Sequence, residues 1–296
     1  MIAGIETGGT KVVCAAAAAE APDVPLLSRR FPTTGPDETI RRITDFLAEA
    51  SADEPLQALG VASFGPVDAA VGSAGFGRIT TTPKPGWADV DLLGRVTPDG
   101  VPAAFVSDVL GAAVGELRYG AGRGARSLAY ATIGTGVGVG IVIDGRPIGG
   151  DGWPEVGHLL VRRHPDDDFA GNCPFHGDCL EGLTAGPAVL ARWGVDASSF
   201  DDSVRDARIA ILASYIAQMA YTVALTVGAE RLVLGGGVML APGLLEAVRA
   251  ALPALAAGYG PAALATADPA DVLLAPAIQD SPGVIGALAL AADLLP

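Results

Sequence analysis

Residues 4–15 are GIETGGTKVVCA, a pattern typical of an apolar strand, a turn of glycine and threonine, and a second apolar strand. Residues 131–142, ATIGTGVGVGIV, repeat this strand–turn–strand pattern. Two such hairpins in one chain predict two similar lobes that face each other across a cleft. No linker rich in serine, proline or charge divides the chain between them.

Strands and helices alternate around the two hairpins, which indicates an α/β protein. Strands are predicted at residues 58–68, 101–109, 231–236 and 271–277, and helices at 37–52, 110–120, 187–193, 204–227, 241–255 and 284–294. The segment 149–182 differs, because it is rich in His, Asp, Pro, Gly and Cys. We expect an irregular insertion there, and long irregular loops in compact domains are usually functional.

The composition excludes several classes of protein. The chain has 296 residues with 19 Lys+Arg against 33 Asp+Glu, and its formal net charge of -14 disfavours nucleic-acid binding. Half of the residues are apolar and only 18% are charged, which excludes a disordered chain. Three cysteines cannot form a disulfide framework, so a reducing compartment is favoured.

Residues 209–229 carry no charge and are long enough to span a bilayer. Ser214, Gln218 and Thr222 interrupt the segment, and a predicted buried strand follows at once, so a buried core helix is favoured over a transmembrane helix. The N-terminal residues lack the basic region of a secretory signal. The sequence therefore predicts a cytoplasmic protein with no membrane partner.

Three glycine turns are candidates for binding a nucleotide. Glycine turns expose backbone N–H groups that can hold phosphate oxygens, and a threonine hydroxyl adds a donor. An ordinary hairpin turn is the alternative for each turn alone, but three of them with flanking strands favour a nucleotide between lobes. Their residues are Gly8, Gly9, Thr10 and Lys11 in the first turn, Gly134, Thr135 and Gly136 in the second, and Gly235, Gly236 and Gly237 in the third.

Asp108 follows an apolar strand directly and precedes a predicted helix. A carboxylate there can accept the proton of a hydroxyl nucleophile that attacks a phosphoryl group. The alternative, an N-cap for the helix, has equal weight from position alone. The only two lysines of the chain are Lys11 in the first turn and Lys84 in TTTPKPGW, which suggests that a compact ammonium is needed at those positions.

The segment 149–182 contains a metal-ligand pattern. Cys173, His176 and Cys179 form a C-x2-H-x2-C run, and His158 upstream completes four nitrogen and sulfur ligands. Such a closed set predicts structural zinc in tetrahedral geometry, whereas unrelated surface cysteines and histidines are the alternative. Glu155 and Glu181 flank the set and could accept hydrogen bonds from a polyhydroxylated substrate, with a solvated surface as the alternative.

Together these motifs resemble the ROK family of sugar kinases, and specifically its bacterial fructokinase branch. GIETGGTK is similar to the family's first phosphate motif, ATIGTGVGVG to its second, and RLVLGGGV to its adenosine-side motif. The resemblance extends over the chain through further motifs, which are GVASFGPVD, TTPKPGW, the run at Asp108, E-x-GH at Glu155–His158 and C-x2-H-x2-CLEG. The central histidine of the metal run and TTPKPGW favour fructokinase over glucokinase.

The resemblance implies the actin-like ATPase (ribonuclease H-like) fold, with an N-terminal lobe of residues 1–110 joined by the C-terminal helix at about 283–296. The C-terminal lobe would span 111–282 and carry the zinc loop 149–182 and the adenosine-side motif. Asp108 would be the catalytic base, and Glu155, His158 and Glu181 would bind the sugar. ATP with Mg²⁺ would bind the three glycine turns and Thr132, and the family tends to form homodimers.

The chain departs from the family pattern at two positions, of which the first bears on the sugar. The family commonly has an asparagine sugar contact two residues after the catalytic aspartate, where this chain has Leu110. Glu6 stands where many relatives carry an aspartate near the metal-phosphate group. We expect transfer of the γ-phosphoryl group of ATP to the 6-hydroxyl of D-fructose. The alternatives are a kinase for mannose, glucose or an N-acylhexosamine and, more remotely, a non-catalytic sugar-responsive regulator.

Overall fold

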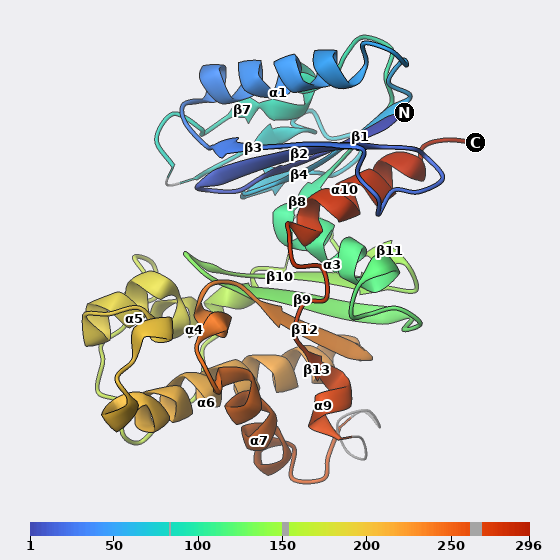
Figure 1. The fold of residues 1–296 in the computed structure, drawn as a ribbon. Helices are drawn as coiled ribbons and strands as arrows, with labels where there is room; N and C mark the ends of the chain where they lie inside the picture. The colour runs from blue at the N-terminus through green and yellow to red at the C-terminus, as the bar shows by residue number, and fades with distance from the viewer. Residues whose placement is uncertain (83, 150–153, 261–267) are drawn as a thin grey trace. The chain divides into compact units, whose positions relative to one another are not determined.

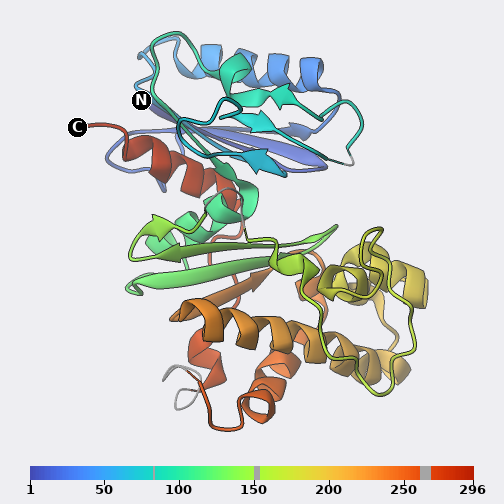
Figure 2. The same ribbon diagram turned by 180° about the vertical axis from the view of Figure 1, so that it is seen from behind.

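The computed structural model describes residues 1–82, 84–149, 154–260 and 268–296. Its contacts divide the chain into two compact units. The first comprises Met1–Arg123, Gly145–Pro154 and Ala277–Pro296, and the second comprises Gly124–Asp144 and Glu155–Pro276. Each unit is a mixed α/β structure with its own sheet (Figures 1 and 2).

The first unit is built on a five-stranded sheet in the order β3-β2-β1-β4-β8. Strands β1, β4 and β8 run parallel to one another. At one edge β2 pairs antiparallel with β1, and β3 pairs antiparallel with β2. A small sheet of three two-residue strands, β5-β6-β7, belongs to the same unit. The strands are β1 (Ile2–Thr7), β2 (Lys11–Ala17), β3 (Leu27–Pro32), β4 (Ala58–Ser63), β5 (Val67–Asp68), β6 (Arg78–Ile79), β7 (Val90–Asp91) and β8 (Ala103–Ser107).

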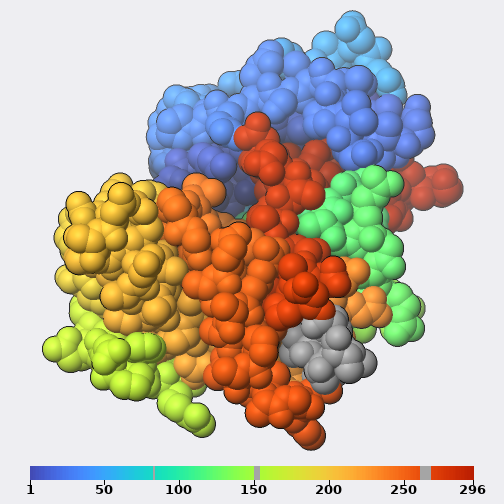
Figure 3. Space-filling view, turned by 60° about the horizontal axis from the view of Figure 1, so that its bottom comes forward, coloured from blue at the N-terminus to red at the C-terminus, as the bar shows by residue number. Residues whose placement is uncertain are grey.

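Helices cover both faces of this sheet because its strands are apolar on both sides. Helix α1 (Pro36–Ala50) packs on one face, and α10 (Pro282–Ala292) packs on the other beside α3 (Asp108–Tyr119). A Cβ at Gly60 would lie 1.9 Å from a carbonyl oxygen of α10, so only glycine permits this close approach. In Figure 3 the C-terminal segment, in red, lies against the blue N-terminal part. A short helix, α2 (Leu92–Val96), completes the unit.

The second unit contains a sheet in the order β10-β9-β12-β13. Helices α6 and α7 lie on one side of it (Figures 1 and 2). The strands are β9 (Ser127–Ile133), β10 (Val137–Ile143), β12 (Arg231–Gly235) and β13 (Leu273–Leu274), and β11 (Arg146–Pro147) follows β10 in the chain. The helices are α4 (Leu180–Thr184), α5 (Gly186–Trp193), α6 (Asp202–Val227), α7 (Leu244–Ala256) and α9 (Pro269–Val272), with 3₁₀ turns η1 (Val156–His158), η2 (Ala197–Ser199) and η3 (Val238–Leu240).

Helix α6 includes residues 209–227 of the uncharged segment 209–229. It is long and apolar enough to cross a bilayer, but 56% of its most apolar 18-residue stretch is buried within the protein. Ten of its residues are buried, and it packs against α4 and α7. This burial is typical of a core helix.

Two boundaries differ from those expected from the sequence. The first unit extends to Arg123 and not to residue 110, because α3 packs along α10 within that unit. The strand predicted over 271–277 contains only Leu273 and Leu274, because Asp268 caps a helical turn immediately before it. Four residues of the expected insertion, 150–153, lie outside the described residues.

Candidate active site

The first glycine turn joins β1 to β2, and each of its three carbonyl groups accepts a hydrogen bond from the protein. Thr33 donates to two of them, from its Oγ1 to the Gly8 oxygen at 2.7 Å and from its N–H to the Thr10 oxygen at 3.0 Å. The Gly9 oxygen accepts from Lys84 Nζ at 2.5 Å. The Gly8 N–H closes the turn on the Lys11 oxygen. The turn is thus held through its carbonyl groups.

The N–H groups of Gly9 and Thr10 are oriented by the same contacts. In a trans peptide the N–H points opposite to the carbonyl of the preceding residue, and the only cis peptide of the described chain is Gly65–Pro66. Within the described residues neither N–H donates to a protein acceptor. The turn can therefore offer two adjacent N–H groups to an anion, as expected for a phosphate-binding turn.

Asp108 lies at the same edge of the first sheet as this turn. Thr7, Ser63 and Ser107 are register partners across the parallel strands β1, β4 and β8. The residues that follow Thr7 and Ser107, the glycine turn and Asp108, therefore leave the sheet at one edge with one strand between them, about 10 Å apart. The carboxyl edge of parallel strands is where α/β proteins commonly bind ligands.

Asp108 is the first residue of α3, and the N-cap is its neighbour Ser107. Ser107 Oγ accepts from the Leu110 N–H at 3.3 Å, whereas Asp108 Oδ1 accepts from the Val109 N–H at 2.8 Å. The capping alternative considered for Asp108 is thus filled by Ser107. A carboxylate in the first turn of a helix is also stabilised by the helix dipole.

The second and third glycine turns lie together in the second unit. Gly235 at the end of β12 is the register partner of Thr132 on the parallel strand β9. Gly236 has a φ of +96°, and a Cβ there would lie 2.4 Å from the Ile133 oxygen. The Gly134 oxygen in turn accepts from the Gly186 N–H at the start of α5, at 2.7 Å. The structure therefore brings these two predicted nucleotide-binding turns to one edge of one sheet.

Glu181 contacts the second turn directly. Its Oε2 accepts from the Val137 N–H at 2.9 Å, and a Cβ at Gly136 would lie 2.8 Å from the same oxygen. Glu155 is exposed and precedes η1, which packs so closely on β10 that a Cβ at Gly157 would lie 2.0 Å from the Val137 oxygen. The Glu181 carboxylate thus lies at the start of β10, and Glu155 immediately precedes the 3₁₀ turn that packs there.

The four predicted metal ligands form one cluster. The donor atoms of His158, Cys173, His176 and Cys179 all lie within 4.8 Å of one another. His158 Nδ1 is 3.7 Å from Cys173 Sγ and 3.5 Å from Cys179 Sγ, and His176 Nδ1 is 3.9 Å from Cys173 Sγ. Zinc–sulfur and zinc–nitrogen bonds in tetrahedral geometry place S and N about 3.6 Å apart, so the spacing of this cluster fits zinc.

The backbone around the cluster is a tight turn. The N–H groups of Cys173 and Gly177 donate to each other's carbonyl oxygens, and Cys179 is the N-cap of α4. Burial raises the pKa of the Cys179 thiol, so this thiol keeps its proton unless a cation stabilises the thiolate. A bound zinc ion would supply that charge and displace the proton.

Comparison with known proteins gives the family. The model of the ROK family matches residues 2–294. The chain belongs to the ROK family. Its relatives include a fructokinase of Zymomonas mobilis, 39% identical over 294 residues, which are 97% of this chain and 95% of that protein. A fructokinase of Streptococcus mutans is 40% identical over 295 residues, 97% of this chain and 96% of that protein.

Solved structures agree with the fold. The crystal structure of a ROK hexokinase from Thermus thermophilus has a TM-score of 0.78 at 25% sequence identity, and the match covers 98% of this chain and 97% of that one. The α/β fold and the family expected from the motifs are therefore confirmed.

The structure places the two residues, Leu110 and Glu6, at which the chain departs from the expected pattern. Leu110 is 1% exposed and lies in the core, so its side chain offers no polar contact to a sugar. Glu6 Oε2 accepts from the Val284 N–H at 3.0 Å, near the start of α10. Burial raises the pKa of Glu6, whereas Lys11 and this N–H oppose the shift. In this ROK protein Glu6 thus connects β1 to α10.

Sequence reasoning missed one supporting residue, Thr33, and gave only a weak hint of another, Lys84. Thr33 is 25 residues from the Gly8 carbonyl to which it donates, and no local motif marks it. Lys84 is distinguished only by the scarcity of lysine.

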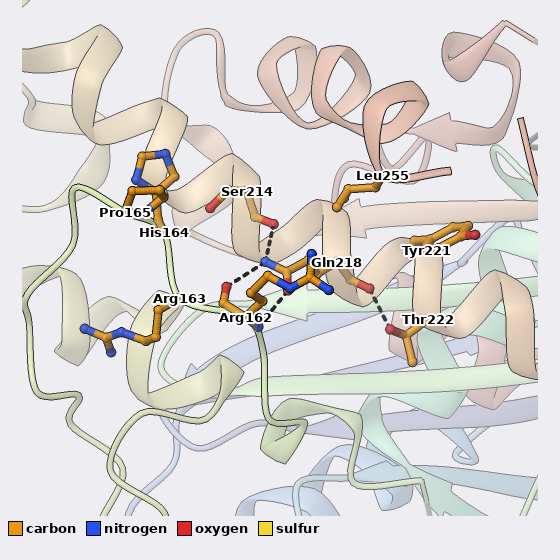
Figure 4. Close-up of a pocket in the computed structure, with 9 residues that line it drawn as sticks. All are labelled: Arg162, Arg163, His164, Pro165, Ser214, Gln218, Tyr221, Thr222 and Leu255. Carbon is orange, nitrogen blue, oxygen red and sulfur yellow. Dashed lines mark hydrogen bonds between the residues drawn. The ribbon is translucent and has the colours of Figure 1, made fainter. Parts of the chain in front are cut away.

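The second unit also has a pocket of about 430 Å³ beside α6 (Figure 4). Gln218 bridges to the backbone of Arg162 there, accepting from its N–H at 2.8 Å and donating to its oxygen at 3.0 Å. None of the predicted site residues lines this pocket.

Proposed function

We propose that this ROK protein transfers the γ-phosphoryl group of ATP to the 6-hydroxyl of D-fructose. The observation that carries this proposal is the similarity, along 83–98% of the chain, to proteins named fructokinase that are 37–41% identical to it. The structural support is that a turn with two N–H groups available to an anion and a carboxylate lie at one edge of one sheet. Mannose, glucose and N-acylhexosamines are the alternative substrates. They remain alternatives because Leu110 stands where the family commonly has an asparagine that contacts the sugar.

Asp108 acts as the general base in this proposal. It accepts the proton of the 6-hydroxyl while the new P–O bond forms and the bond to the β-phosphate oxygen of ATP breaks. The N–H groups of Gly9 and Thr10, with Lys11, neutralise charge on the phosphates. Thr132 and the second and third turns bind the remainder of the nucleotide. Mg²⁺, which accompanies ATP in such reactions, adds charge neutralisation.

The Cys/His cluster is proposed to hold one structural zinc ion. His158, Cys173, His176 and Cys179 supply a closed set of four ligands, which leaves no open position for catalysis. The metal would hold the segment that carries Glu155 and Glu181, and these carboxylates with His158 would bind the sugar hydroxyls. The contact of Glu181 with the Val137 N–H supports this, because it limits the freedom of that carboxylate.

A cytoplasmic homodimer completes the proposal. The three free cysteines suit a reducing compartment. Leu160 and Phe175, beside the metal cluster, are 79% and 81% exposed, which is unusual for large apolar side chains outside an interface. Sedimentation analysis of the protein and of Phe175→Ser tests this: the dimer is wrong if the wild-type protein sediments as a monomer at micromolar concentration.

A substrate panel tests the reaction. ADP release is measured with fructose, mannose, glucose and N-acetylhexosamines, at equal concentration and with MgATP in excess. We expect the largest kcat/KM with fructose, and the phosphorylated position follows from ³¹P–¹H correlation in the product. A larger kcat/KM with another hexose would assign that sugar, and failure with all of them would contradict the kinase proposal.

A further inference from the structure

Lys84 is one of only two lysines in the chain, and it reaches the same turn that contains the other. Its ammonium donates to the Gly9 carbonyl oxygen at 2.5 Å, across 75 residues of sequence. The other 17 Lys+Arg residues of the chain are all arginines. A charge-assisted hydrogen bond from a compact ammonium is therefore a particular feature of this turn.

The segment around Lys84 is held on both sides. Trp87 is fully buried, donates from Nε1 to the Thr34 oxygen at 2.9 Å, and packs edge-on against Phe64. On the other side, Thr80 donates to the Pro66 oxygen through both its N–H and its hydroxyl. The Lys84 N–H donates to Thr82 Oγ1. These anchors flank Lys84 closely, so the backbone from which its ammonium reaches the turn is held in place.

The Lys84 contact completes the set that orients the turn. Thr33 already fixes the Gly8 and Thr10 carbonyl groups, so the peptide between Gly9 and Thr10 is left to Lys84. Holding the Gly9 oxygen toward the ammonium directs the Thr10 N–H to the opposite side of that peptide. The positive charge also polarises the peptide, which makes its N–H a stronger donor.

We propose that Lys84 is a positioning residue for the nucleotide phosphates: by fixing the Gly9–Thr10 peptide, it aims the Thr10 N–H at a phosphate oxygen. The proposal rests on the proposed function, since it assigns the phosphates of ATP to this turn. Lys84 thus affects nucleotide binding through the backbone of the turn, and its side chain does not contact the sugar.

The kinetic test compares three variants with the wild-type enzyme. Lys84→Met removes the charge and the donor while keeping the apolar stem, Lys84→Arg restores a cationic donor, and Arg95→Met removes a surface cation that pairs with Asp37. We expect Lys84→Met to raise the KM for ATP about tenfold and to leave the KM for sugar within about twofold. Lys84→Arg should recover most of the loss, and Arg95→Met should behave as wild type.

A purely structural role would give a different pattern. Loss of the support of the 80–87 segment would lower the melting temperature and would change both KM values together. Equal changes of the two KM values, or an unchanged KM for ATP in Lys84→Met, would overturn the proposal.

A binding measurement separates this proposal from the proposed function. Calorimetry with MgADP requires no sugar, so it remains decisive even if the substrate panel finds no phosphorylated hexose. We expect MgADP to bind Lys84→Met about tenfold more weakly than it binds the wild-type protein. In protein labelled with ¹⁵N-lysine, only Lys11 and Lys84 give signals, and MgADP should shift the Lys84 Nζ signal. Equal MgADP affinity of the two proteins, or no MgADP binding to wild type, would contradict the role of Lys84.

Discussion

The first and second glycine turns have similar sequences, but the protein supports them with opposite charges. In the first turn a carbonyl group, that of Gly9, accepts from the Lys84 ammonium. Directly after the second turn an N–H group, that of Val137 at the start of β10, donates to the Glu181 carboxylate. A cation thus supports a carbonyl group within the first turn, whereas an anion accepts from the N–H group that follows the second turn.

This difference shows that two turns with a similar strand–turn–strand pattern can lie beside side chains of opposite charge. Backbone turns present both donors and acceptors, and the side chain that reaches the turn selects which of them remain. A phosphate is favoured where the carbonyl groups are occupied, as in the first turn. Beside the second turn, a fixed carboxylate favours hydroxyl groups, which supports Glu181 as a sugar ligand.

The largest expected effect tests whether the edge that holds the first turn is the site of chemistry. Asp108→Asn keeps an oxygen for the Val109 N–H but cannot take up a proton at neutral pH. We expect kcat to fall by about 10²–10⁴, with the melting temperature and sugar affinity nearly unchanged. Steady-state kinetics with calorimetry of sugar binding checks this. A variant that keeps more than half of the wild-type kcat would remove Asp108 as the base.

The next largest effect concerns the proposed zinc site at His158, Cys173, His176 and Cys179. Cys179→Ser should lower the zinc content from about one ion per chain and lower the melting temperature by about 5 °C or more. Because Glu181 lies two residues beyond Cys179, the KM for sugar should rise more than the KM for ATP. Elemental analysis and kinetics measure both effects.

His164→Gln is the matched control for the metal, since His164 lies in the same segment but outside the cluster. The His164→Gln variant should keep its zinc. Wild-type protein that is purified without chelator and is fully active without zinc would contradict the metal assignment. Equal effects of Cys179→Ser on sugar and ATP would show that the metal supports the whole fold and not the sugar site in particular.

Two substitutions of Glu181 separate the role of its negative charge from the role of its hydrogen bond beside the second turn. Glu181→Gln keeps an oxygen for the Val137 N–H, whereas Glu181→Ala leaves that N–H without its acceptor. We expect Ala to lower the free energy of unfolding by about 1–3 kcal/mol and Gln by much less. Both should raise the KM for sugar if the carboxylate binds hydroxyl groups. Denaturant unfolding and kinetics decide, and equal losses of stability would contradict the role of this hydrogen bond.

The smallest expected effect sharpens the comparison at the first turn. Gly9 is not in the left-handed region and a Cβ there would meet no atom within 4 Å, so Gly9→Ala should change the unfolding free energy by about 0.5 kcal/mol or less. Gly236→Ala in the third turn, with its φ of +96° and a backbone clash, should cost about 2 kcal/mol or more.

Any rise in the KM for ATP of Gly9→Ala would then report a ligand that approaches the backbone closely. An unchanged KM would place the phosphates away from Gly9. The unfolding measurements on the two variants keep this inference independent of stability.

The sequence predicted the two central hairpins, helix α6 and the four-residue metal cluster, because each is a local pattern. Alternation of apolar residues marks the hairpins, and the C-x2-H-x2-C run marks three of the ligands within seven residues. The strand at 271–277 was predicted too long because its apolar run does not reveal the helical turn that Asp268 begins. Asp108 could be placed at a strand end, but its two interpretations could not be separated without the hydrogen bond of Ser107.

Only the tertiary structure decided which side chains complete the turns. Lys84 meets Gly9 across 75 residues and Glu181 meets Val137 across 44, and neither contact has a sequence signature. The physical reason is that the backbone of a glycine turn is chemically the same wherever it occurs. Whether the turn offers N–H groups or carbonyl groups to a ligand depends on the side chains that the packing of distant segments brings to it.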